Sequence, residues 1–80
     1  MAIKRVKLTF PQELIKEPVI FTMARKFNVI PNIRSARITE SVGEVVLELE
    51  GEEVELAAGI AYLEERGVKV NAVEGDALGS

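Results

Sequence analysis

The sequence contains no cysteine and no histidine. Without cysteine the chain can form no disulfide bond, no thiolate nucleophile and no thiolate metal site. Without histidine it lacks the commonest general base and metal ligand at neutral pH. We therefore expect a protein that is not an enzyme and holds no cofactor, and we assign no catalytic or metal-binding residue.

Long apolar runs and an excess of basic charge are also absent. No apolar run reaches the roughly 18–20 residues that span a bilayer, and the first residues lack the apolar core of a signal peptide. We expect no direct membrane insertion, and the cytoplasm is the simplest location. The net charge is −3, whereas nucleic-acid-binding proteins usually carry a basic surface. No nucleic-acid partner is expected.

The residues that are present describe one small globular domain. Hydrophobic residues make up 48% and charged residues 29% of the 80 residues, a balance typical of folded proteins. We place the domain at residues 3–73. Residues 74–80 show no periodicity and are expected to form a flexible C-terminal tail.

Alternating apolar residues predict the strands. A first strand over residues 3–10 ends at Pro11, which cannot donate a hydrogen bond to a sheet. Residues 33–39 and 45–49 predict two strands joined by a tight turn, in which Gly43 supplies the permissive backbone. Residues 68–70 predict a short fourth strand. The expected inward side chains are Val6, Leu8, Phe10, Val45, Leu47 and Leu49.

Helical spacing and stop signals predict two helices. The first spans residues 18–27, with Pro18 in its first turn and Asn28 as a left-handed stop. The second spans residues 52–66 and ends before Gly67. Its expected buried stripe is Leu56, Ala57, Ile60 and Leu63.

The order strand, helix, strand, strand, helix, strand predicts an α+β, ferredoxin-like βαββαβ fold. Right-handed crossovers would place both helices on one face of a four-stranded antiparallel sheet. The other face, here called the open face, would be left uncovered. It lacks the aromatic side chains that RNA-recognition domains use. The connector 11–17 has no glycine and two acids, which disfavours a phosphate-binding loop.

Two polar residues near the start of the second strand are candidates for binding. Asn32 has low strand propensity, and its side chain can either close a turn of its own backbone or bind a ligand. By strand parity, Arg34 falls on the inward face, where it extends past the core edge or pairs with an acid or an anion. The same parity places Ile33 on the open face.

Short segments spread along the chain resemble the NIL domain. They are LTF (8–10), EP (17–18), FNV (27–29), NI (32–33), LELEG (47–51), AYL (61–63) and GVKV (67–70). NIL domains are ferredoxin-like and occur as regulatory domains on the ATPase subunit of bacterial methionine importers, attached to ferredoxin domains, or alone. In the importers two copies pair, and bound methionine holds the transporter inactive.

The resemblance implies a ligand site at Asn32, Ile33 and Arg34, because the family takes its name from an Asn-Ile-Leu motif whose asparagine contacts the ligand. Arg34 stands where the family has leucine, and the hairpin turn is short. Both features favour the ferredoxin-associated or stand-alone branch. The resemblance therefore predicts a homodimeric regulatory domain that senses methionine or a related amino acid. The alternative is a ligand-free interaction module associated with a ferredoxin or ATPase partner.

Overall fold

A computed structural model describes residues 1–73, so the expected tail at 74–80 lies outside the described residues. The elements are β1 (Ala2–Phe10), a short 3₁₀ helix η1 (Gln12–Leu14), α1 (Val19–Phe27), β2 (Ile30–Ile38), β3 (Gly43–Gly51), α2 (Glu53–Glu65) and β4 (Lys69–Ala72). This order confirms the predicted one, with a single turn of 3₁₀ helix added in the connector between β1 and α1.

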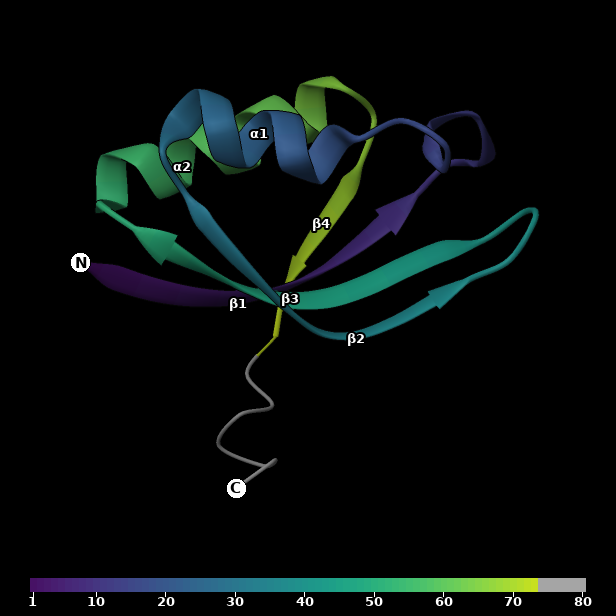
Figure 1. Cartoon of the computed structure of the whole chain (residues 1–80), viewed down its shortest axis with the longest axis horizontal. Helices are drawn as coiled ribbons and strands as arrows, with labels where there is room; N and C mark the ends of the chain where they lie inside the picture. Colours follow the sequence, from purple (N-terminus) through teal and green to yellow (C-terminus); the bar gives the residue numbers. More distant parts are fainter. Residues whose placement is uncertain (74–80) are drawn as a thin grey trace.

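The strands form one antiparallel sheet in the order β2-β3-β1-β4. Both helices cover the same face of this sheet, and no element formed by residues 1–73 lies on the opposite face (Figure 1). The connections β1-α1-β2 and β3-α2-β4 both place their helix on this face and so form a single helical layer. The ferredoxin-like fold is confirmed.

The core lies between the helices and the two central strands. Val6 pairs with Leu47 and Leu8 with Val45 across β1 and β3. All four side chains are buried, and burying such a side chain contributes roughly 1.5–3 kcal/mol. Strict alternation along both strands keeps these residues on the helical side, as the sequence predicts.

α1 ends at Phe27, as predicted, and α2 ends at Glu65, one residue before the predicted end. Asn28 adopts the left-handed conformation, with φ of 60°. Gly67 has φ of 103°, a conformation that residues with a side chain rarely adopt. Its N–H donates to the Glu64 carbonyl at 3.0 Å, and the Val68 N–H donates to the Leu63 carbonyl at 2.9 Å. These two bonds satisfy carbonyls that the end of α2 would otherwise leave unpaired.

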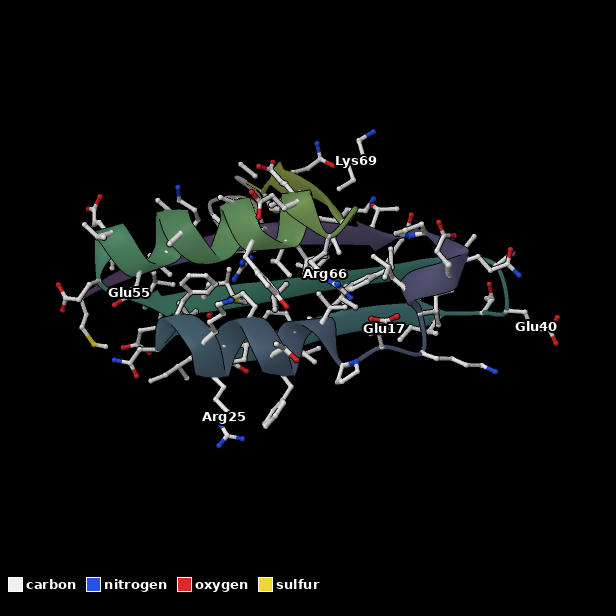
Figure 2. All side chains as sticks on the ribbon, turned by 90° about the horizontal axis from the view of Figure 1, so that it is seen from above. Glu17, Arg25, Glu40, Glu55, Arg66 and Lys69 are labelled. Carbon is white, nitrogen blue, oxygen red and sulfur yellow. The ribbon has the colours of Figure 1, made fainter. Side chains whose placement is uncertain are left out.

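The contact between the two helices differs from the prediction. Ala57 is exposed, and Gly59 is buried in its place against Met23. A Cβ atom on Gly59 would lie 2.8 Å from the Met23 sulfur. The glycine therefore allows α1 and α2 to approach closely. At the other end of the pair, Arg66 bonds Glu17 at 2.6 Å, and the two side chains reach toward each other in Figure 2.

The β2–β3 turn is closed by Thr39 and not by Gly43, so that prediction is wrong. The Thr39 N–H donates to the Val42 carbonyl at 2.7 Å, and the Thr39 hydroxyl accepts from the Val42 N–H at 3.0 Å. Gly43 begins β3 and does not have positive φ. A Cβ atom there would lie 3.3 Å from both Ile15 and Phe10. The position needs a small residue for space.

An irregularity in β2 also changes the side of the sheet on which two of its residues lie, compared with the prediction. Ile33 pairs with Leu47, on the helical side, whereas Ser35 pairs with Val46, on the open face. The register therefore shifts at Arg34, which has no paired residue on β3. One inserted residue reverses the alternation that strand parity assumes. The assignments of Ile33 to the open face and of Arg34 to the inward face are wrong.

Candidate functional site

Three polar side chains lie in a row across the open face. Asn32 on β2 is paired with Glu48 on β3, and Glu48 is paired with Arg5 on β1. The Arg5 Nη2 atom donates to the Glu48 Oε2 atom at 2.6 Å. Side chains directly opposite each other on neighbouring antiparallel strands lie within interaction distance. The sheet therefore presents an amide, a carboxylate and a guanidinium side by side.

The carboxylate of this row is held in its ionised form. The hydrogen bond from Arg5, followed by the charges of Arg5 and Arg34, lowers the pKa of Glu48 against a partial desolvation that would raise it. Arg34 exerts this influence from the irregularity in β2, where its side chain is exposed. The charge of Arg34 thus acts on the open face.

A hollow of about 210 Å³ lies beside the row. It is lined by Ile3, Ile30, Pro31, Asn32, Glu48 and Glu50. Two of these apolar side chains are well exposed, Ile3 at 65% and Ile30 at 56%. Glu48 is engaged by Arg5, whereas no side-chain hydrogen bond within residues 1–73 involves Glu50. The hollow therefore combines carboxylates, one amide and an apolar wall.

The structure separates the residues that the NIL motif brings together in sequence. Asn32 lines the hollow on the open face. Ile33 points to the helical side and lines a different hollow, together with Phe21 and Arg25 of α1. Arg34 lines neither of them. Only Asn32 of the three is therefore part of the polar hollow itself.

Asn32 does not close a turn of its own backbone, which was the other interpretation of this residue. The side-chain hydrogen bonds formed within residues 1–73 do not include it. Its amide thus has both donor and acceptor capacity for a bound molecule.

Sequence reasoning missed the other members of the site, which are Ile3, Arg5, Ile30, Glu48 and Glu50. These residues can be identified only from the pairing register of the strands, which determines the neighbours of Asn32. Counting back from a turn at residues 39–42 gives Leu49 as the partner of Asn32, and the residue inserted at Arg34 moves the partner to Glu48. The predicted turn at Gly43 placed this register incorrectly.

Within residues 1–73 no group of three or more acidic, cysteine or histidine side chains is arranged to hold a metal ion. In the same residues no helix is both long and apolar enough to cross a membrane.

The sheet order and the single helical layer define a ferredoxin-like α+β domain. The family model described as the NIL domain matches residues 4–72, which is most of the chain. The chain belongs to the NIL domain family.

Its relatives are transport proteins. It is 37% identical over 75 residues to the methionine import ATP-binding protein MetN 1 of Listeria monocytogenes serotype 4b, covering 89% of this chain and 22% of that protein. It is 31% identical over 74 residues to MetN of Bacillus subtilis, covering 88% and 22%. The chain thus spans about a fifth of the length of these relatives.

A solved structure has the same fold. It is the C-terminal domain of an ABC transporter ATP-binding protein from Enterococcus faecalis, with a TM-score of 0.79 and 27% identity. The match covers 89% of this chain and 83% of the solved one. The likeness therefore extends over nearly the whole domain.

Proposed function

We propose that this chain is a small-molecule-binding regulatory domain that senses methionine, or a related amino acid, through a homodimer. The observation that supports the proposal most is the position of Asn32 in a hollow with carboxylates and exposed isoleucines. The names of the relatives add that domains of this kind occur in methionine import ATPases.

The hollow offers complementary groups for an amino acid. A ligand ammonium group would lie against Glu50, because Glu48 is already engaged by Arg5. The ligand carboxylate would accept from the Asn32 amide, with the positive charge of Arg34 nearby. An unbranched apolar side chain such as that of methionine would lie on Ile3 and Ile30. Each part of the ligand therefore meets a group of suitable chemistry.

A second copy of the chain would complete the site. The hollow is open on the sheet surface, and Ile3 and Ile30 are exposed beside it. A domain of this size has a small core, so burying such residues between two copies would add stability. If the ligand binds the paired arrangement more tightly than the separate copies, it shifts the population toward the pair.

In this proposal the domain is attached to an import ATPase on the cytoplasmic side of a membrane. The relatives are methionine import ATP-binding proteins, and this chain matches about a fifth of their length. They favour the transporter branch of the family, whereas Arg34 and the short hairpin turn favoured the ferredoxin-associated or stand-alone branch. The domain itself would perform no chemistry, and its ligand-dependent pairing would bias the conformation of the ATPase.

Titration calorimetry with a panel of amino acids tests the ligand. We expect methionine or a close relative to bind the parent chain, and Asn32→Ala to weaken this binding at least about tenfold, the loss typical of a hydrogen bond to a charged group. Asn71→Ala is the matched control, because Asn71 is also an exposed asparagine on the open face, opposite Lys7. It should leave binding unchanged. If no amino acid binds at millimolar concentration to a folded sample, the sensing function is wrong.

The alternative function is a ligand-free interaction module. It is favoured by β2, an edge strand in which every residue except Pro31 is exposed. Under this alternative, Asn32→Ala would change neither association nor any ligand affinity.

A further inference from the structure

β2 presents a free edge along its full length. It is the last strand of the described sheet on its side and pairs only with β3. The backbone N–H and C=O groups on its other side therefore have no strand partner within residues 1–73. Exposed edges of this length are templates for the addition of another strand. Charged side chains are one device that limits such pairing to suitable partners.

An apolar groove runs beside this edge, between α1 and β2. Two hollows share Ile20 and Phe21: one of about 180 Å³ extends to Ile38, and the other extends to Ile33. Phe21 is 63% exposed and Ile38 is 60% exposed. We call the strip formed by Ile20, Phe21, Ile33 and Ile38 the α1–β2 groove. Apolar side chains gathered along an open groove are typical of docking surfaces for peptide segments.

The charged residues of α1 and β2 all have one sign, and Glu17, which lines one of the two hollows, is bonded by Arg66 at 2.6 Å. Residues 18–39, which form α1 and β2, contain arginine and lysine but no aspartate or glutamate. In contrast, every charged residue from 40 to 65 is a glutamate. Arg25 projects from α1 away from α2 (Figure 2), and Arg34 and Arg37 are exposed on β2. An acidic chain therefore carries a locally basic edge, which is complementary to an acidic partner.

The strand already paired with β2 shows which sequence suits this edge. On the open face, Glu44 of β3 lies opposite Arg37. On the helical side, Leu47 lies opposite Ile33. Because the pleat of β2 directs its side chains, a strand on the free edge meets the same two faces. It would need acids on the open face and apolar residues on the helical side, as β3 has.

A second copy of this chain does not supply such a strand. Its β3 lies inside the sheet, so only β2 and β4 are edges. Pairing β2 with β2 would bring Arg34 and Arg37 of one copy near those of the other. β4 has only 4 residues and carries Lys69. Like charges on neighbouring strands are destabilising, so a different polypeptide fits this edge better.

We propose that the free edge of β2 and the α1–β2 groove dock an extended, acidic segment of another polypeptide. Its acidic side chains lie toward Arg34 and Arg37, and its apolar side chains enter the groove beside Phe21. This docking surface is centred on residues 33–38 of β2 and shares Pro31 with the hollow at Asn32. Docking does not require an amino-acid ligand.

A short peptide with the sequence of residues 43–51, GEVVLELEG, serves as the probe. It is blocked at both ends and titrated into the isotope-labelled 80-residue chain, followed by NMR. We expect shifts in the amides of residues 33–38 and of Phe21, slower hydrogen exchange along the same part of β2, and no change in β4. The control peptide GKVVLKLKG keeps the apolar pattern and reverses the charges. It should bind at least about tenfold more weakly at low salt.

A pair of charge-reversed variants tests the surface itself. Arg25→Glu with Arg37→Glu reverses two exposed charges at the groove and should weaken binding of the acidic peptide at least about tenfold. Lys4→Glu with Lys69→Glu makes the same change in net charge at exposed sites elsewhere and should leave binding nearly unchanged. Methionine titrated into the same samples reports separately on the Asn32 hollow.

Four results would overturn the docking proposal. They are no peptide binding at millimolar concentration, equal losses in both variant pairs, shifts that map to β4 or the open-face hollow, and protection of β2 amides as the chain alone is concentrated. The last result would assign the edge to a second copy.

Discussion

Asn32 on β2 lies directly across the sheet ladder from Glu48 on β3. Glu48 is fixed from its other side by Arg5 at 2.6 Å. The amide that the NIL motif contributes is thus placed beside a carboxylate whose position and charge are set by the neighbouring strand. This relationship connects the fold to the proposed function, because the register of a β-hairpin determines which groups a ligand meets.

The Arg5–Glu48 pair makes stability depend on pH. The pKa of Glu48 is lowered in the folded chain, so its ionised form stabilises the fold above the unfolded pKa, and this stabilisation is lost as the pH falls through the folded pKa. We expect Glu48→Gln to lower the melting temperature at pH 7. Below the unperturbed glutamate pKa of about 4.3, the difference from the parent should shrink.

Thermal melts followed by circular dichroism from pH 7 to pH 3 would measure this difference. Glu40→Gln, in the exposed β2–β3 turn, is the control and should follow the parent at every pH. A Glu48→Gln deficit that stays constant across the range would contradict the role of the ion pair.

Leu47 tests the core. Its side chain is 0% exposed, and Leu47→Ala should cost about 2–5 kcal/mol in the free energy of unfolding. In a domain of this size, that loss would unfold much of the population. Val54→Ala, at an 80% exposed position on α2, should change the unfolding free energy by less than about 0.5 kcal/mol. Urea denaturation compares the two, and a Leu47→Ala midpoint equal to the parent's would contradict the assigned core.

Gly59 tests the close approach of the helices. Gly59→Ala would place a Cβ atom 2.8 Å from the buried Met23 sulfur, which costs roughly 1–3 kcal/mol through overpacking. The better helix propensity of alanine offsets about 1 kcal/mol of this. We expect a net loss of about 1 kcal/mol by urea denaturation. In a Met23→Val background the shorter side chain should remove this loss, and an unchanged loss there would contradict the steric explanation.

Local signals predicted the elements and their ends well. Asn28 and Gly67 end the helices because each adopts a left-handed conformation available to few residue types. Alternation in β1 and β3 identified the inward residues, since both strands pack directly under the helices. These features depend on short stretches of sequence and can be predicted from them.

The features that sequence analysis predicted incorrectly depend on contacts between distant segments. Gly43 lies in β3, where a Cβ atom would be 3.3 Å from Ile15 and Phe10, so its small size serves packing and not a turn. The face of Ile33 depends on an inserted residue that only the pairing with β3 defines. The hollow at Asn32 requires that same register, which is why a motif of consecutive residues named one member of the site and missed its neighbours.

The most direct test of the proposed function is an NMR titration of the isotope-labelled chain with methionine. We expect the amides of Ile30, Asn32 and residues 48–50 to shift together with one saturable affinity, while those of Phe21 and Ile38 in the α1–β2 groove do not shift. Shifts confined to that groove, or none at millimolar methionine, would contradict a ligand site at Asn32.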